Sequence, residues 1–149
     1  MKLVEVTLPT RSSIFLTFKI NDNISLRPGQ YILLQCENIS TIEWHPFFIT
    51  DFVIEPRKTI FTLAITVRGD WTCELYEKLF ELKMYSEKSG KRKSNRSRRK
   101  YRTSARKLNF IFDGPYSNHM ESILSRECVV LIGQGIGITP FISIFNYVM

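Results

Sequence analysis

The stretch TIFTLAITVRGDWTCELYEKLFEL, Thr59–Leu82, changes from strand periodicity to helix periodicity within 24 residues. Its first part, Thr59–Val67, is rich in β-branched side chains and predicts a strand. After the GDWT sequence at 69–72, leucines recur at positions 75, 79 and 82, with aromatic residues beside them. This spacing places the leucines on one face of a helix, so the pattern predicts a helix over 72–84.

More strands are predicted on the amino-terminal side of this stretch, at 3–8, 14–20, 31–36 and near 47–52. In the first two, alternate residues are apolar, and each strand is expected to bury one face. The sets that alternate are Val4, Val6 and Leu8, and then Ile14, Leu16, Phe18 and Ile20. The sequence RPGQ at 27–30 predicts a type II turn, because proline sets φ at the second position and glycine accepts a positive φ at the third.

The chain after the helix predicts a different architecture. A short strand, Leu108–Phe112, leads into DGPY at 113–116, which predicts a turn. Cys128–Ile132 is a continuous apolar run, typical of a strand buried in a parallel sheet. The glycine-rich GQGIGITP at 133–140 follows, and then a predicted helix, Thr139–Met149. Many short strands followed by a late βα unit favour an antiparallel barrel joined to the start of an α/β domain.

The stretch from 128 to 149 has no charged residue over 22 positions, which is long enough for a membrane span. Its glycines and Pro140 favour the strand–turn–helix interpretation instead. Glycines after a buried strand allow backbone N–H groups to approach a phosphate, and the following helix start favours an anion. The spacing is GxGxG, so a tight βα turn without a ligand is the alternative interpretation.

The net charge of +7 comes from one segment. Residues 88–107 hold eleven basic side chains and no acidic one, whereas the other 129 residues carry ten basic against fourteen acidic side chains, a charge of −4. This composition predicts a disordered insert in a mildly acidic globule. The three cysteines lack a CxxC or Cys/His ligand spacing, which argues against a disulfide framework or zinc site. The amino terminus lacks the apolar region of a secretory signal.

The sequence WHPFFIT at 44–50 contains candidate binding residues. His45 and Phe47 flank the rigid Pro46, and they offer a phosphate donor and an aromatic platform for a planar ligand. The alternative is a core strand with one satisfied histidine.

Five motifs occur in a fixed order: PGQY at 28–31, EWHPF at 43–47, GDWT at 69–72, DGPY at 113–116 and GQGIGITPF at 133–141. In this order the chain resembles the cytosolic dehydrogenase region of NADPH oxidases, within the ferredoxin–NADP reductase and ferric reductase superfamily. EWHPF together with GDWT favours the oxidase branch. The basic insert looks most like that of the calcium-regulated oxidases that carry EF-hands.

The resemblance implies a mainly β fold. We expect an antiparallel Greek-key FAD-binding barrel with one helix over 1–117, including a basic disordered insert at 86–107. Residues 118–149 are then the first βα unit of a truncated, Rossmann-like NADPH domain. The implied reaction is that of an oxidoreductase: hydride passes from NADPH to FAD, and single electrons then pass to membrane haem and oxygen at the cytoplasmic face of a membrane. We expect this chain alone, itself soluble, to show no NADPH-dependent dye reduction.

The resemblance also implies the cofactor-binding residues, while no catalytic side chain or metal ligand is expected. His45 would face the flavin phosphates and Phe47 the isoalloxazine. The full set is His45, Pro46, Phe47, Ile49, Thr50, Arg68, Trp71 and Thr72 for FAD, and Gly133, Gly135, Ile136, Gly137, Thr139 and Pro140 for NADPH.

Three positions differ from the family pattern. Phe48 stands where the family places a hydroxyl residue near the flavin ring. The usual arginine position is Thr66, but Arg68 lies two residues on and so shares its strand face. Ser117 replaces a common glycine.

The sequence leaves three interpretations of the basic segment 88–107 open. It is a solvated loop without a partner, a loop that binds anionic lipid headgroups, or a site for an acidic regulator such as calmodulin or an EF-hand domain. Nucleic acid is not expected, because only Tyr101 is available to stack on a base. The alternative function for the whole chain is a non-catalytic interaction module, or a degenerate fragment, that binds anionic lipid or acidic protein through this loop.

Overall fold

The structure is a computed structural model that describes residues 1–90, 108–117 and 119–149. The predictions made for residues 91–107, which hold most of the basic segment, lie outside the described residues.

The described chain contains one antiparallel sheet with the strand order β1-β2-β5-β4-β3-β6. Its strands are β1 (Lys2–Thr10), β2 (Ser13–Ile20), β3 (Tyr31–Cys36), β4 (His45–Glu55), β5 (Lys58–Thr66) and β6 (Phe110–Tyr116). The helices are α1 (Asp70–Gly90) and α2 (Thr139–Val148), with short 3-10 helices η1 (His119–Ser125) and η2 (Gly135–Ile138).

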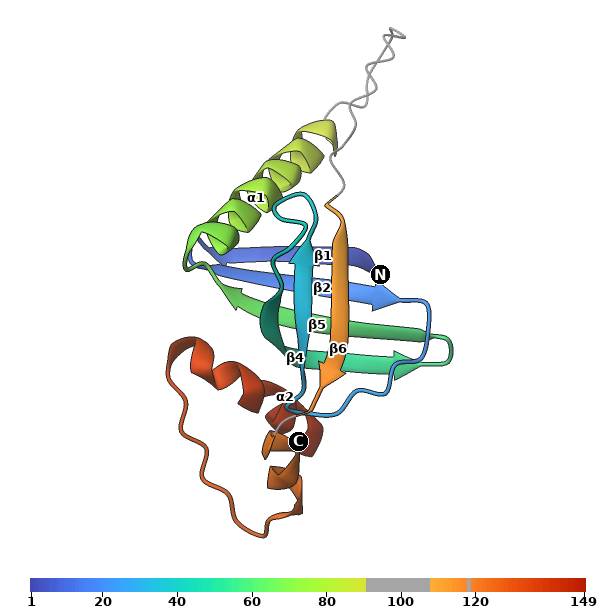
Figure 1. The fold of residues 1–149 in the computed structure, drawn as a ribbon, viewed down its shortest axis with the longest axis vertical. Helices are drawn as coiled ribbons and strands as arrows, with labels where there is room; N and C mark the ends of the chain where they lie inside the picture. The colour runs from blue at the N-terminus through green and yellow to red at the C-terminus, as the bar shows by residue number, and fades with distance from the viewer. Residues whose placement is uncertain (91–107, 118) are drawn as a thin grey trace, which may run out of the picture.

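The strand order forms a Greek key. β3, β4 and β5 are sequential neighbours, and β2 lies beside β5 after the longer connection from residue 21 to 30. β4 belongs to two layers, since His45–Phe48 pairs with β3 whereas the strand from Ile49 onward pairs with β5. A register shift just after Ile49 bends the strand at this corner. Figure 1 shows β6 running across β1, β2 and β5, and the predicted mainly β barrel is confirmed.

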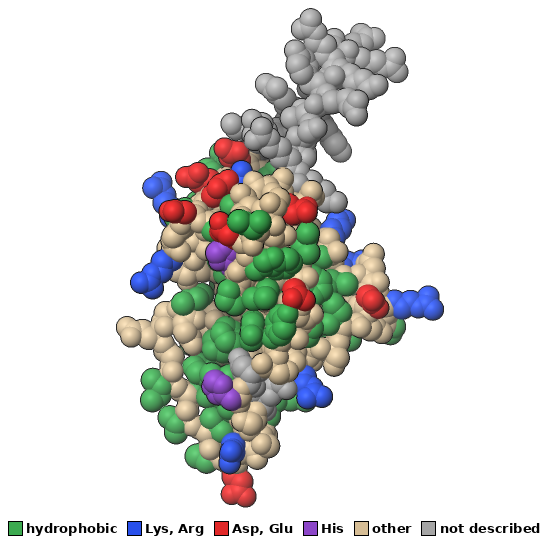
Figure 2. All heavy atoms as spheres, in the orientation of Figure 1, with side chains coloured by type: hydrophobic (Ala, Val, Ile, Leu, Met, Phe, Trp, Pro, Cys, Tyr) green, Lys and Arg blue, Asp and Glu red, His purple; other side chains and the backbone are tan. Residues whose placement is uncertain are grey.

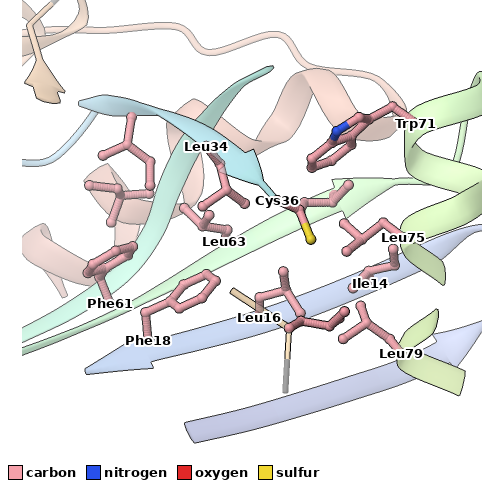
Figure 3. Close-up of a cluster of buried hydrophobic side chains, with 14 of the residues drawn as sticks. Ile14, Leu16, Phe18, Leu34, Cys36, Phe61, Leu63, Trp71, Leu75 and Leu79 are labelled. Atoms are coloured by element: carbon pink, nitrogen blue, oxygen red, sulfur yellow. The ribbon is translucent and has the colours of Figure 1, made fainter. Parts of the chain in front are cut away.

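The core lies between these two layers and α1 (Figure 3). Ile14, Leu16 and Phe18 are fully buried, as the alternation in β2 predicted. Leu75 and Leu79 of α1 are also buried, which confirms the predicted leucine face. The core residues at the centre of the cluster are Ile14, Leu16, Phe18, Leu34, Cys36, Phe61, Leu63, Trp71, Leu75 and Leu79.

The helix ends later than predicted. α1 continues to Gly90, so the first residues of the predicted disordered insert, 86–90, are helical and that part of the prediction is wrong. No glycine or proline interrupts the chain between Leu82 and Gly90, and most of the intervening residues are compatible with a helix.

β1 differs from its predicted alternation at one residue. Leu3 lies opposite Phe18 and Val6 lies opposite Leu16, but the register shifts between them. Val4 is the extra residue of this bulge and is 46% exposed, so its predicted place on the buried face is wrong. Leu3 packs against the core instead.

The DGPY sequence is the end of β6 rather than a turn that follows it. Tyr116 lies opposite Tyr31, and Asp113 lies opposite Leu33, so the register shifts within the motif. Gly114 has a φ of 116°, a conformation that glycine adopts without strain. The motif therefore bulges without leaving the sheet.

The strand predicted at Cys128–Ile132 is not formed in the structure. Val130 and Ile132 are 80% and 88% exposed. A parallel strand satisfies its backbone through neighbouring strands, and none of the described strands lies beside this segment. The helix predicted after it is confirmed as α2.

Within the described ranges, no helix is long and apolar enough to cross a membrane.

Candidate functional site

Three aromatic side chains from two elements meet at the start of α1. The ring centroids of His45 and Trp71 are 4.3 Å apart, and those of Phe47 and Trp71 are 6.1 Å apart. His45 and Phe47 are alternate residues of β4, so their side chains share one face of the strand. The structure thus brings together three residues predicted from two separate motifs.

Trp71 carries a polar atom that lacks a partner. Its side chain is 6% exposed, and its Nε1 is buried with no hydrogen-bond acceptor among the described residues. An unsatisfied buried donor costs roughly 1–3 kcal/mol, so nearly all such groups have a partner. The indole N–H is therefore a ready donor for a ligand that enters this cluster.

The turn before α1 is held by Thr72. The Thr72 hydroxyl accepts the backbone N–H of Arg68 at 2.6 Å and donates to the carbonyl of Gly69 at 3.1 Å. Gly69 has a φ of 94°, and a Cβ there would meet nothing within 4 Å. The Thr72 side chain thus shapes the turn, while the first N–H groups of the helix, at Asp70 and Trp71, have no intrahelical acceptor.

The charged groups at this turn are few. His45 Nε2 lies 3.2 Å from a carboxylate oxygen of Glu43, and both side chains are partly exposed. The Arg68 side chain is exposed and forms no ion pair with any residue that the structure describes. A histidine, an exposed guanidinium and a helix start together favour an anion, whereas Glu43 competes for the imidazole.

Other residues predicted on β4 serve the barrel itself. Ile49 is fully buried in the core. The Thr50 hydroxyl donates to the carbonyl of Thr62 at 3.1 Å, at the corner where β4 bends. Pro46 is exposed, on the strand face opposite to that of His45.

Phe48 lies on the same face as Pro46, outside the core, in an aromatic group that the sequence did not predict. Its ring is edge-on to Tyr31 at 5.9 Å between centroids, and Tyr31 stacks on Tyr116 at 5.5 Å. The Tyr116 hydroxyl donates to Asp113, and this bond raises the pKa of the phenol. In Figure 2, hydrophobic side chains gather over the region where Figure 1 draws β3 and β6.

The glycine-rich loop has the shape expected for close approach. Gly135 has a φ of 57°, and neither Gly135 nor Gly137 has any atom within 4 Å of a hypothetical Cβ. Gly133 is packed, since its Cβ would lie 3.1 Å from the Cα of Ile138. The loop passes through η2 directly into α2, with Pro140 in the first turn of that helix.

The remaining loop residues differ in exposure. Ile136 is exposed, whereas Thr139 and Pro140 are buried. The Thr139 hydroxyl donates to the carbonyl of Ile136 at 2.8 Å, so it closes the turn rather than facing outward.

Two contacts that the sequence did not predict hold α2 against the barrel. The Gly29 backbone N–H donates to the Ser143 hydroxyl at 2.8 Å, and Asn146 Nδ2 donates to the carbonyl of Thr50 at 3.3 Å. No local pattern signals these contacts, because they join residues about a hundred positions apart.

Residues 1–120, about four fifths of the chain, match the FAD-binding domain family. The chain belongs to this family. This FAD-binding domain is also 37% identical over 85% of its length to a superoxide-generating NADPH oxidase heavy chain of Dictyostelium discoideum. It is 33% identical over 98% of its length to respiratory burst oxidase homolog protein A of Solanum tuberosum, and 36% identical over 99% to human NADPH oxidase 5.

The predicted resemblance to NADPH oxidases is confirmed: the chain is an FAD-binding domain of the NADPH oxidase kind. It spans 17%, 14% and 20% of the lengths of these three relatives. The matches do not support the alternative of a non-catalytic interaction module. The assignment to the calcium-regulated branch stays a prediction.

The residues around Trp71 fit FAD on the chemistry of their donors. The diphosphate of FAD is an anion that accepts hydrogen bonds. The start of α1 presents amides without an intrahelical acceptor and a buried indole N–H without an acceptor among the described residues, and His45 of β4 lies beside it. The isoalloxazine ring of the flavin is planar and aromatic, and the aromatic side chains supply a surface for its flat face.

Proposed function

We propose that this domain holds FAD along β4 and the start of α1, and that it carries the flavin of a longer NADPH oxidase. The observation that supports this most directly is the meeting of His45, Phe47 and Trp71 around a buried indole N–H that has no acceptor among the described residues. If His45 and Trp71 served only to pack the core, this buried N–H would stay without a hydrogen-bond partner, which is rare in folded proteins.

In this proposal each residue has a distinct task. His45 and the exposed Arg68 neutralise the diphosphate, and the first amides of α1 donate to it. Thr72 is a positioning residue, since its hydroxyl fixes the turn that presents those amides. Phe47 contacts the flavin ring. FAD, when bound, supplies the ability to accept a hydride and to release single electrons.

Ile49, Thr50 and Pro46 contribute differently. The side chains of Ile49 and Thr50 are used inside the barrel, so we propose that they set the path of β4. Pro46 holds the strand rigid between the two residues that contact the cofactor.

We further propose that residues 118–149 begin an α/β domain that binds NADPH through Gly133, Gly135, Ile136, Gly137, Thr139 and Pro140. The open glycines allow a phosphate to approach the backbone. The outward side chains of this segment support a larger domain, because Val130, Ile132 and Phe145 leave a large apolar surface exposed. Such surface is normally covered by further chain.

In the longer protein, electrons would then pass from NADPH to FAD, and onward to membrane haem and oxygen. The domain would lie at the cytoplasmic face of the membrane. There the basic segment 88–107 would meet anionic lipid headgroups, each basic residue contributing about 1 kcal/mol, or an acidic regulatory domain.

The test is a titration of the chain with FAD, followed by quenching of flavin fluorescence, for the natural sequence and for Phe48→Thr. We expect saturable binding by the natural chain, because Phe48 packs on Tyr31 and lies on the strand face away from Trp71. Binding by Phe48→Thr alone would mean that the flavin site has degenerated. If neither binds while circular dichroism shows both to be folded, the proposed function is wrong.

Phe80→Thr is the matched control. Phe80 is another partly exposed aromatic residue, on α1 and stacked only on Tyr76 among the described aromatic rings. Its replacement should leave FAD binding unchanged.

A further inference from the structure

One turn of the barrel contacts three distant parts of the chain. The type II turn at 27–30 is confirmed, with Gly29 at a φ of 82° and the Gln30 amide 3.4 Å from the carbonyl of Arg27. The carbonyl of Gln30 accepts the backbone N–H of Ile49 at 3.0 Å, so the turn is bonded to β4 where that strand bends. Gln30 Nε2 donates to Ser117 at 3.2 Å, where the chain leaves β6.

The third contact is to α2. The Gly29 amide donates to the hydroxyl of Ser143, and this hydroxyl lies near the carbonyl of Pro140 at 3.4 Å. Ser143 is 2% exposed, so both partners are removed from water. A buried amide without an acceptor is costly, which makes the position of the hydroxyl specific.

The packing around Gly29 is equally restrictive. A Cβ on Gly29 would lie 2.9 Å from the Cβ of Met120 and 3.8 Å from Ile144. The absence of a side chain therefore lets α2 and the segment before it approach the turn closely.

The face that α2 presents to the barrel is small and partly polar. Thr139, Pro140, Ser143 and Ile144 are its buried residues. Phe145 and Val148 are exposed instead. Apolar burial alone would favour the opposite orientation, so the hydrogen bonds to Ser143 and Asn146 orient this helix.

We propose that Gly29 and Ser143 form a latch that sets the distance between the flavin strand β4 and the glycine-rich loop 133–140. The loop leads directly into the helix that Ser143 anchors, and the same turn is bonded to β4. Ser143 is thus a positioning residue for transfer between two cofactors. The role in transfer rests on the proposed function, whereas the latch itself does not.

The test compares amide hydrogen exchange, measured by NMR, in the natural chain and in Ser143→Ala. We expect the Gly29 amide to exchange at least about fivefold faster in the variant, the equivalent of about 1 kcal/mol. The amides of the last turn of α2 should accelerate with it, whereas the amides of β2, in the barrel core, should not. Unchanged exchange at Gly29 would overturn the proposal, and so would equal acceleration throughout the barrel.

Three variants separate the effect of the Ser143 hydroxyl from the effects of side-chain size and of losing any serine hydroxyl. Ser143→Thr keeps a hydroxyl that can accept the Gly29 N–H, whereas Ser143→Val has the shape of threonine but no hydroxyl. Only the threonine variant should therefore protect the Gly29 amide from exchange. Equal behaviour of this pair would contradict the latch. Ser122→Ala is the matched control, because the exposed Ser122 hydroxyl donates only to the carbonyl of His119 among the described contacts, and it should change nothing at Gly29.

Asn146→Ala covers the case in which no Ser143 variant folds. It removes the second contact of α2 from an exposed residue, and it should accelerate α2 exchange without disturbing the barrel. The Gly29 amide should stay protected in this variant, because Ser143 still accepts it, and loss of that protection would contradict the latch. An FAD titration of the same samples keeps the proposals separate: FAD binding with no change in exchange rejects the latch alone, and the reverse result rejects the flavin site alone.

Discussion

The imidazole of His45 lies against the indole of Trp71, with ring centroids 4.3 Å apart and planes inclined by 33°. The contact joins the first residue of β4 to the first turn of α1. It brings the two motifs EWHPF and GDWT, which are more than twenty residues apart in the sequence, into a single site. In the proposed FAD site, a strand residue and a helix start would therefore act on the same ligand.

Trp71→Phe should weaken FAD binding about three- to tenfold, because it removes one hydrogen bond while keeping an aromatic ring. In the chain without cofactor no hydrogen bond among the described residues is lost, so any loss of stability should come from the smaller ring at this buried core position. Flavin fluorescence and urea unfolding measure the two effects. Trp44→Phe, at an exposed tryptophan, is the control, and an unchanged affinity in Trp71→Phe would refute the role of the indole.

Leu75→Ala should lower the free energy of unfolding by about 2–5 kcal/mol, as expected for a leucine that is completely buried. Phe80→Ala, on the same helix but 47% exposed, should cost less than half as much. Denaturant unfolding followed by far-UV circular dichroism gives both values. Similar losses would mean that α1 does not pack on the barrel through the leucine face.

The three cysteines should differ sharply in reactivity. Cys73 and Cys128 are exposed, whereas Cys36 is buried, and burial raises the pKa of the Cys36 thiol above its ordinary 9.0. A thiol reagent at pH 8 should therefore label two cysteines quickly and Cys36 only at the rate of opening. Rapid labelling of all three would contradict the buried position.

The raised pKa of Cys36 also predicts a pH dependence of stability. The folded state favours the neutral thiol, so this contribution is complete below about pH 9 and is lost as the pH rises through the folded pKa. Between pH 8 and pH 10.5, the natural chain should lose more unfolding free energy than Cys36→Ala. Equal losses in the two proteins would contradict a raised pKa of the Cys36 thiol.

Tyr116 should be the phenol that ionises late. Its hydrogen bond to the Asp113 carboxylate raises its pKa above the ordinary 10.0. In a titration followed by absorbance near 295 nm, Tyr116→Phe should remove amplitude from the high-pH end. Asp113→Asn should move that amplitude to lower pH, and a titration that Asp113→Asn leaves unchanged would exclude the bond.

The sequence predicted those parts of the fold that arise from local periodicity. The buried face of β2 and the leucine face of α1 repeat at regular intervals, and hydrophobic burial selects the face. The bulge at Val4 was missed because register is a property of two strands, and one strand's sequence does not contain it. Cys128–Ile132 has strand composition, but a strand also needs neighbours.

The site was predicted unevenly for the same reason. His45, Phe47 and Trp71 were found because each belongs to a recognisable motif. Ser143 carries no such mark, since its partner Gly29 is 114 residues away and its role depends on tertiary packing. The orphaned state of the indole nitrogen also required coordinates, because it depends on the absence of acceptors around it in the described structure.

The length of α1 limits how a partner at one end of the helix could influence the other end. The helix has 21 residues, so about 30 Å separates its first turn from its last. The first turn belongs to the proposed anion site, and the last residues lead into the basic segment. That separation is more than three Debye lengths at physiological salt, where the Debye length is about 8 Å. The electric field of a partner at the far end would therefore be largely screened at the proposed FAD site, and an influence on that site would have to pass through a movement of α1 that shifts Trp71.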